Sequence, residues 1–527
     1  MVRLASLRRS AVVPFVASCL IGIVWLNQGQ KAARVDAIVS AHQADPAANP
    51  LGVVRYVLLN LYERSGDEEI YFAVANAIRG LPYDHARLTS RGQDTPASFA
   101  RAPAEDGRWH RPYTEVPLEY PVAMVPLILL PSFIAGESFE AYTRAFGALM
   151  AVLLLAAAAL AIRVQPAENA RRQWWWMTAL LLAQGGLAIR RLDALPALLL
   201  TITLFAAAER RVATAGVALG LATATKLLPA ILAAPLVAAD RALWRSPGAR
   251  LRGVVGFAAA VCAGLGPMLF PPDALLGFLR YHSARGLHVE STWAVLLCTW
   301  RLATAGPSPS TMSYGSFNID GPAATLVASL STWIAVVLVG VITVRCARAS
   351  APDSEVARRD RLAIALLAAL AALWLSAKVF SPQYLTWALP LVLAVSVKRG
   401  ETLRWLLFAI MTLTQIYLRG YYGQVIHGTP KGWTPSISAR IVAEGPARPR
   451  LAGYPTSAPD ESRATGLDAR RRARRSPDVT RACRLKPRLR ESRLRRSRTR
   501  SRERARVRSA PTVTRAARRW RRRATPG

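Results

Sequence analysis

The chain has 527 residues, of which 52% are hydrophobic, and its formal net charge is +37. The apolar residues are gathered into long blocks, which match the ~20 apolar residues needed to cross ~30 Å of hydrocarbon. Five cysteines without a Cys-x-x-Cys pair argue against a disulfide or zinc framework. These features exclude a small disulfide-bonded protein and predict an all-α, polytopic membrane protein.

The first apolar run, residues 11–26, follows Arg3, Arg8 and Arg9, as the apolar part of a signal sequence does. No convincing small-residue cleavage site follows it. We therefore predict that residues 1–27 form an uncleaved transmembrane helix with a cytoplasmic N-terminus, and a cleaved signal peptide is the alternative. Residues 28–115 then form a first extracytoplasmic loop.

Residues 116–430 are predicted to form one multi-pass membrane domain. About 11 membrane segments are expected in the whole chain, and several of the apolar runs are shorter than a full span. The candidate spans are residues 11–26, 116–134, 142–162, 174–189, 194–208, 212–239, 254–270, 323–344, 362–376, 384–397 and 403–418.

Basic clusters orient the second half of the chain. Arginines and lysines gather in residues 241–252, 345–361 and 398–404, and the positive-inside rule predicts that these loops are cytoplasmic. Residues 271–322, residues 377–383 and the segment after Leu418 are then expected on the outer face, with the first loop.

The first half presents a conflict. Arg163, Arg171 and Arg172 also have the pattern of a cytoplasmic loop, yet three candidate spans separate them from Arg241. An odd number of crossings cannot join two segments on the same side. One run must be re-entrant or broken, and the run 212–239 carries Lys226 and Pro229 in its middle. The sequence does not decide which run is irregular.

Polar side chains are concentrated in three places at the boundaries of apolar runs. These are Gly66–Tyr71 in the first loop, Arg285–Trp293, and Lys378–Trp387. Such groups are costly at a membrane unless they bind something or pair with one another. Acidic groups in one segment and basic or amide groups in the others indicate a membrane enzyme that acts on a charged lipid.

In combination these segments resemble the GT-C superfamily of membrane glycosyltransferases, and within it glycosyltransferase family 87. The resemblance covers roughly residues 60–430. The order and spacing of the motifs along a polytopic chain carry the resemblance. The segments that carry it are residues 66–71, 80–83, 116–121, 191–195, 215–220, 225–229, 285–293 and 378–387.

The resemblance implies transfer of a hexose, expected to be mannose, from a polyprenyl-phosphate-sugar donor to a lipid-linked or glycan acceptor. The reaction would invert the anomeric carbon on the outer face of a bacterial plasma membrane. It also implies an acidic general base in the first loop, because a carboxylate must take the proton of the attacking hydroxyl. Asp67 is the first choice, and Glu68 and Glu69 are the alternatives. A solvated acidic helix start is the structural explanation of the same three residues.

The resemblance and the polar clusters together predict a set of substrate-binding residues. Lipid phosphate is the anion expected at the basic members of this set, and hydroxyl groups are expected at the others. The set consists of Glu119, Tyr120, Arg191, Asp193, Lys226, Arg285, His288, Glu290, Ser291, Lys378, Ser381, Gln383 and Tyr384.

Structural explanations compete for several members of this set. Glu119 and Tyr120 fit an ordinary helix entry at the interface, and Arg191 with Asp193 fits a short charged turn. Lys226 could snorkel to the interface, and His288 could simply lie there. No cofactor is predicted, because no carboxylates or imidazoles show clear metal-ligand spacing. The adjacent acids at 67–69 leave a divalent metal open.

The C-terminal region differs from the rest of the chain. Residues 440–527 contain 29 Lys and Arg against 7 Asp and Glu, so residues 431–527 are predicted to be a basic disordered tail. Attachment to a membrane body argues against a nucleic-acid partner. A second hypothesis is that the tail is translated from a shifted reading frame, because the apolar blocks stop abruptly. An uninterrupted, verified frame would exclude it.

A second function class remains open from the sequence. A polytopic transporter or flippase of a lipid-linked sugar would also carry charged groups among apolar helices. Such a protein is expected to place polar groups near the middle of the membrane and to contain internal repeats. Here most unusual residues lie at outer boundaries and no clear repeat is present, so the sequence favours the enzyme. The expected partners are the sugar donor, the acceptor and the lipid bilayer.

Overall fold

The structure, a computed structural model, describes residues 13–20, 66–85, 103–116, 118–269, 272–304 and 310–418. Of the described residues, 76% are helical. The chain divides into the units Met1–Arg450 and Leu451–Gly527, and everything below concerns the first unit. Most of the first predicted helix, most of the first loop and the whole basic tail lie outside the described residues.

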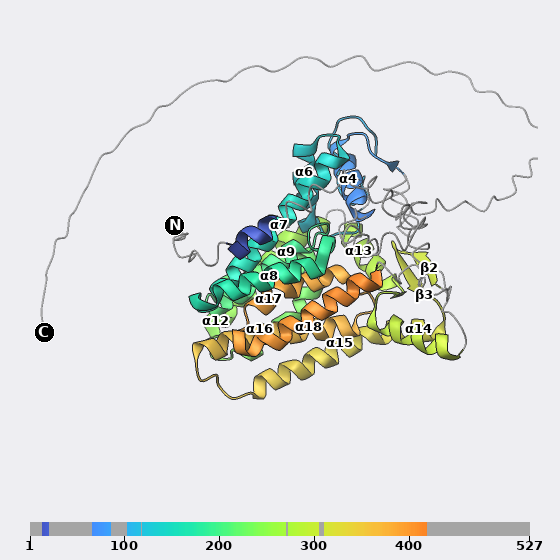
Figure 1. Ribbon diagram of the computed structural model, residues 1–527. Coiled ribbons are helices and arrows are strands. Elements are labelled where there is room, and N and C mark those ends of the chain that lie inside the picture. The colour runs from blue at the N-terminus through green and yellow to red at the C-terminus, as the bar shows by residue number, and fades with distance from the viewer. Residues whose placement is uncertain are drawn as a thin grey trace, which may run out of the picture. The chain divides into compact units, whose positions relative to one another are not determined.

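Most described helices run side by side in a bundle (Figure 1). Short 3-10 helices, labelled η, interrupt or extend several of them. The larger helices are α4 (Gly66–Arg79), α6 (Val125–Ala135), α7 (Phe139–Arg163), α8 (Ala170–Gln184), α9 (Ala194–Ala208), α10 (Val212–Thr225), α12 (Pro247–Leu265), α15 (Pro322–Arg348), α16 (Glu355–Ser376) and α18 (Val397–Ile416).

Three of the described helical segments are long and apolar enough to cross a membrane: Phe139–Arg163, Pro247–Leu269 and Pro322–Arg348. Their length and composition identify a helical membrane protein. The total of about 11 spans stays a prediction, since several other apolar helices in the described residues are shorter than 18 residues.

The bundle has two chemically different ends. Helix α9 begins after Asp193 and ends at Ala208, so its ends are about 22 Å apart. We call the end that contains residues 190–193, Lys226 and residues 378–384 the site end. The opposite end, which contains Glu209, Asp240 and Arg358, is called the network end.

The run 212–239 is not one membrane span, and its prediction as a single candidate span is corrected. Helix α10 stops at Thr225, Lys226 is extended, and η8 (Leu228–Leu232) and α11 (Ala233–Ala239) follow. Pro229 disfavours a continuous helix, because it lacks an N–H and constrains the residue before it. The chain therefore reaches the site end at Lys226 and returns to the network end at Asp240.

This break removes the conflict in the predicted topology. Four segments, α8, α9, α10 and η8–α11, now join Arg172 to Arg241, and an even number returns the chain to the same end. Two contacts agree with this arrangement: Arg358 Nη1 lies 2.7 Å from Asp240 Oδ2, and Arg359 Nη1 donates to the Val164 carbonyl at 3.1 Å.

The predicted span 384–397 is also irregular. It consists of η10 (Pro382–Trp387) and the short helix α17 (Ala388–Leu393). The segment returns to the network end, where the Ser396 hydroxyl donates to Asp360 at 2.6 Å. A buried short helix of this kind is compatible with a membrane because other helices surround it, and every residue of α17 is buried.

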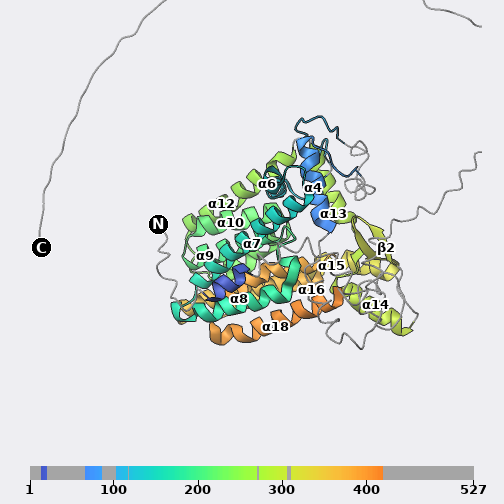
Figure 2. The same cartoon turned by 45° about the horizontal axis from the view of Figure 1, so that its top comes forward.

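The all-α prediction holds for the bundle but misses a small antiparallel sheet. Strands β1 (Leu287–His288), β2 (Ser310–Ser313) and β3 (Ser316–Ile319) pair in the order β1-β3-β2. Tyr314 and Gly315, which both have positive φ, form the two-residue hairpin turn between β2 and β3. Figures 1 and 2 show the sheet beside α14 (Thr292–Thr304), and α13 (Pro272–Ala284) precedes it.

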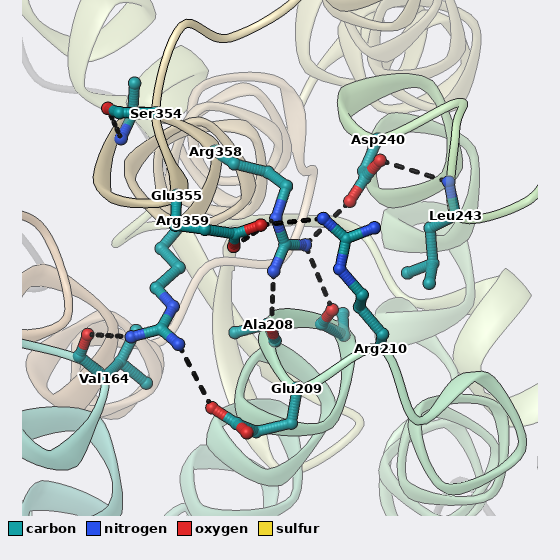
Figure 3. A network of polar contacts seen from close by, with 12 residues as sticks. Val164, Ala208, Glu209, Arg210, Asp240, Leu243, Ser354, Glu355, Arg358 and Arg359 are labelled. Carbon is teal, nitrogen blue, oxygen red and sulfur yellow. Dashed lines mark hydrogen bonds and ion pairs between the residues drawn. The ribbon is translucent and has the colours of Figure 1, made fainter. Parts of the chain in front are cut away.

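An ion-pair network joins the helix ends at the network end (Figure 3). Arg358 is 5% exposed; its guanidinium contacts Asp240 and donates to Glu355 at 2.8 Å. It also donates to the carbonyls of Ala207 and Ala208 at the end of α9. A cation at a helix C-terminus satisfies carbonyls that have no partner within the helix, so this network fixes the start of α16 against α9 and α11.

Candidate functional site

The acidic motif of the first loop forms the first turn of α4, and it docks on a pair of arginines. Asp67 forms an ion pair with Arg191. Glu68 accepts two contacts from Arg190 Nη1, at 3.0 and 2.9 Å. The two arginines are adjacent in the turn between α8 and α9, so each takes one of two adjacent acids.

The two acidic residues have different surroundings. Glu68 is 0% exposed and its partner Arg190 is 6% exposed, so this pair is enclosed by the protein. The side chains of Asp67 and Arg191 are 12% and 21% exposed, which leaves both within reach of a ligand. Glu69, the third acid, is half-buried in the same turn.

Asp193, two residues beyond Arg191, is the centre of a second cluster. Its Oδ1 accepts hydrogen bonds from Lys226 Nζ and from Trp387 Nε1, both at 2.8 Å. Asp193 is 1% exposed, and its Oδ2 is buried with no hydrogen-bond partner among the described residues. A buried carboxylate oxygen without a partner is costly, so this oxygen is a candidate acceptor for a ligand hydroxyl.

Lys226 lies at the helix break and also faces two aromatic rings. Its ammonium is 4.5 Å from the ring centre of Tyr384 and 5.7 Å from that of Trp387. Contacts of this kind stabilise a cation that has lost part of its hydration. The structure thus brings together predicted site residues from three distant segments, Asp193, Lys226 and Tyr384.

Glu119 and Tyr120 connect α4 to α13. The Tyr120 hydroxyl is 3.3 Å from the Tyr71 hydroxyl, and the Tyr281 hydroxyl donates to Glu119 Oε2 at 3.1 Å. Tyr281 also lies 2.7 Å from the Tyr314 carbonyl in the hairpin turn. Glu119 is therefore more than an ordinary helix entry, because it contacts the segment that leads to Arg285.

Two cations lie beside each other on this side of the site. Arg285 Nη2 donates to the Ser316 hydroxyl at 3.0 Å, and Lys378 Nζ donates to the Ser283 carbonyl at 2.7 Å. Burial and the positive charge of Arg285 lower the pKa of Lys378. Two neighbouring cations that destabilise each other favour an anion between or beside them.

His288 and Ser291 mainly hold the backbone. The His288 ring lies 2.6 Å from the Phe380 carbonyl through Nδ1, and the His288 backbone N–H donates to the Lys378 carbonyl at 2.9 Å. Burial, with a smaller contribution from Arg285, lowers the pKa of His288 to about 4, against the opposing effect of the Phe380 contact. Glu290 lies 3.8 Å from the same ring nitrogen. Ser291 caps α14 by accepting from the Ala294 N–H.

The remaining predicted residues lie in or beside η10. Ser381 precedes η10 and makes no side-chain capping bond, and Gln383 is 8% exposed. The Gln383 side-chain oxygen is buried without a hydrogen-bond partner in the described part of the chain. Tyr384 faces Lys226. Gln383 and Asp193 thus each contribute an open acceptor oxygen at the site end.

Sequence reasoning missed four residues of this site: Arg190, Tyr281, His282 and Trp387. Arg190 had a signal, since it adjoins Arg191. Trp387 also had a signal, because it ends the polar segment Lys378–Trp387. Tyr281 and His282 lie outside the singled-out segments and had none. Burial and the charge of Arg285 lower the pKa of His282 to about 4, while Glu119 opposes this shift. Lys226 makes a small further contribution that lowers the same pKa.

Within residues 66–85 and the other described ranges, no group of three or more His, Cys, Asp or Glu side chains could hold a metal ion. Asp67 and Glu68 face two different arginines, which explains why these two acids do not converge on one point. No protein-family model, curated protein or solved structure matches the chain. Function must therefore be argued from the site itself.

Proposed function

We propose that the protein is a membrane glycosyltransferase that moves a hexose, mannose in the simplest case, from a polyprenyl-phosphate-sugar to a lipid-linked or glycan acceptor. One observation supports this most strongly. Asp67 pairs with Arg191 at the site end of the bundle, the end that also holds the cations Lys226 and Lys378. A carboxylate base next to several cations suits a reaction whose leaving group is a phosphate.

The proposed chemistry is a single displacement. The oxygen of the acceptor hydroxyl attacks the anomeric carbon, the bond from that carbon to the phosphate oxygen breaks, and the proton of the hydroxyl passes to Asp67. The phosphate leaves with its charge balanced by cations, so no covalent enzyme intermediate is needed. Positioned proton transfer of this kind contributes ~10²–10⁴-fold to a rate.

Binding of the donor is proposed to break the ion pair between Asp67 and Arg191. In the structure the Arg191 guanidinium holds the Asp67 carboxylate. A lipid phosphate competes for the same guanidinium, because arginine binds phosphate and carboxylate with similar geometry. Donor binding would then loosen Asp67 and leave its oxygens able to accept the proton of the acceptor.

The other residues fit roles in binding. Arg285 and Lys378 are proposed to hold the donor phosphate, since each already donates to a neutral oxygen that a phosphate oxygen could replace. Asp193 Oδ2 and Gln383 Oε1 are proposed to accept from sugar hydroxyls, because both are buried acceptors without a partner in the described residues. His288 is proposed to position the Lys378–Phe380 backbone.

The test supplies radiolabelled polyprenyl-phosphate-mannose to membranes that contain the protein and to matched membranes that lack it. A new labelled glycolipid in the first sample supports the proposal. The competing function, a transporter, is favoured by one observation, the broken run at Lys226, since broken helices line transport pathways. Movement of the labelled donor across the membrane without a new glycosidic bond would support the transporter and contradict the glycosyltransferase.

A further inference from the structure

A groove lies at the other end of the bundle, far from the acidic motif. It has a volume of about 540 Å³ and is lined by Glu168, Arg171, Arg172, Trp175, Trp176, Ala179, Trp405 and Phe408. These residues come from α8, from α18 and from the turn before α8. The two helices contact each other, and Figure 2 shows them side by side.

The groove has an aromatic wall and a basic rim. The rings of Trp176 and Trp405 meet edge to face with their centres 4.9 Å apart, and Trp405 lies 5.9 Å from Phe408. Trp175 and Trp405 are 45% and 57% exposed. Tryptophan prefers the boundary between hydrocarbon and head groups, so this end of the groove is expected at the membrane interface.

Two arginines lie at the N-terminal end of α8, where the helix dipole disfavours positive charge. Arg171 and Arg172 lie in the first turn of α8, which contains no acidic residue and whose N-cap makes no side-chain hydrogen bond. Positive side chains there oppose the helix dipole, whereas an anion is stabilised by it. Arg172 pairs with Glu401 of α18 at 2.8 Å. Arg171 is exposed and forms no ion pair with the residues that the structure describes.

We infer that this groove binds one anionic phospholipid. The phosphate of the head group lies against Arg171 at the N-terminal end of α8. An acyl chain follows Trp176, Ala179 and Phe408, since Ala179 lies about 12 Å along the helix from Arg171. Glu168, on the rim beside the head group, favours a lipid with a single negative charge over a multiply charged one. The bound lipid would contact both α8 and α18 and so stabilise their packing. It would thereby also stabilise the turn 190–193, which follows the C-terminal end of α8.

The test uses the fluorescence of the groove tryptophans in bilayers of fixed composition. Full-length protein is placed in mixed phosphatidylglycerol and phosphatidylcholine, with bromines on the acyl chains of one lipid or of the other. Bromine quenches only nearby tryptophans. The total anionic fraction is the same in both samples, so the samples differ only in which lipid carries the quencher.

In the wild-type protein, brominated phosphatidylglycerol is expected to quench more than brominated phosphatidylcholine. Trp405→Phe should remove much of this excess, which assigns it to the groove. Arg171→Gln should lower the local preference for phosphatidylglycerol by about fivefold, the value of one basic residue at an anionic surface. Arg250→Gln is the matched control, because Arg250 is an exposed arginine in the first turn of α12.

Equal quenching by the two brominated lipids in the wild-type protein would overturn the inference. So would an equal loss in Arg171→Gln and Arg250→Gln, since the preference would then reflect general surface charge. Arg171→Lys keeps the charge but not the planar guanidinium, and it should retain most of the excess quenching. Thermal unfolding of each variant in detergent separates lost binding from lost folding.

Discussion

Asp67 and Glu68 are neighbours in the chain, yet their environments assign them different tasks. Glu68 and Arg190 are enclosed together, while Asp67 and Arg191 keep partly exposed side chains. A base must reach the acceptor hydroxyl, so the less enclosed pair suits chemistry and the fully enclosed pair suits the docking of α4. If both acids had the same surroundings, the structure would not distinguish the proposed base from the docking residue.

Glu68→Gln should therefore lower stability. Removing one partner of a buried ion pair leaves the other charge uncompensated and typically costs ~3–5 kcal/mol. The thermal unfolding midpoint of the purified protein in detergent should fall clearly for Glu68→Gln and stay unchanged for Glu137→Gln, an exposed acid between α6 and α7. Equal midpoints for the two variants would mean that the Glu68 pair does not hold α4 in place.

The low pKa of His288 predicts that the stability of the protein depends on pH. The folded pKa is about 4 and the ordinary value is 6.5, so between these two values the unfolded state binds more protons. Stability should therefore fall as the pH drops below 6.5, by about 2 kcal/mol at pH 5 for one such histidine. In His288→Gln, which keeps a donor near the Phe380 carbonyl, the unfolding midpoint should fall less between pH 7 and pH 5. An identical slope in both proteins would contradict this.

At the scale of helices, α10 and α12 pack with their backbones in close contact. A Cβ atom on Gly216 would lie 2.1 Å from the Gly253 carbonyl oxygen, and one on Gly220 would lie 2.4 Å from the Phe257 carbonyl oxygen. Small residues at such contacts allow membrane helices to approach closely. This packing holds α10 in place up to Thr225, and hence places Lys226 at the site.

Gly216→Ala should destabilise the protein, because backbone atoms cannot move aside as a flexible side chain could. Overpacking of this kind costs ~1–3 kcal/mol. The matched control is Gly340→Ala in α15, where nothing lies within 4 Å of the added carbon and alanine is the better helix former. The unfolding midpoint should fall for the first variant only. A fall of the same size in both would show that the α10–α12 contact is not tight.

The elements differ in how far sequence could predict them. Helix α9 was predicted at 194–208 and observed there, because charged residues bound its apolar run on both sides. The break at Lys226 was only one option, since Pro229 is tolerated in some continuous helices. The three strands have only two to four residues, which is too short to show the alternation of apolar and polar side chains that identifies a strand. The pairing of Asp67 with Arg191 had no local signal, because the two segments are far apart in the chain and meet only through packing.

At the largest scale, the described part of the chain has the basic clusters of its loops at the network end and the polar site at the other end. Arg163 ends α7 there, Arg171 and Arg172 begin α8, and residues 345–361 and 398–404 adjoin the same end. The positive-inside rule then predicts that the network end faces the cytoplasm and the site end faces outward.

Cysteine labelling tests this orientation. In a background with the five native cysteines replaced, Ser283→Cys should react with a membrane-impermeant maleimide in intact cells, because this exposed residue lies at the site end. Ser350→Cys, exposed in the loop between α15 and α16, should react only after the cells are opened. Labelling of both positions from outside, or of Ser350→Cys alone, would contradict the orientation.

The most direct measurement compares glycolipid formation by purified wild-type and Asp67→Asn protein in defined lipid with a labelled polyprenyl-phosphate-mannose donor. The asparagine keeps the size and much of the hydrogen bonding but cannot take the proton. Transfer should fall by ~10²–10⁴-fold, while the unfolding midpoint and donor binding persist and Glu69→Gln loses less activity. Transfer by Asp67→Asn within a few-fold of wild type would remove Asp67 from the mechanism, and no transfer by wild type would contradict the proposed function itself.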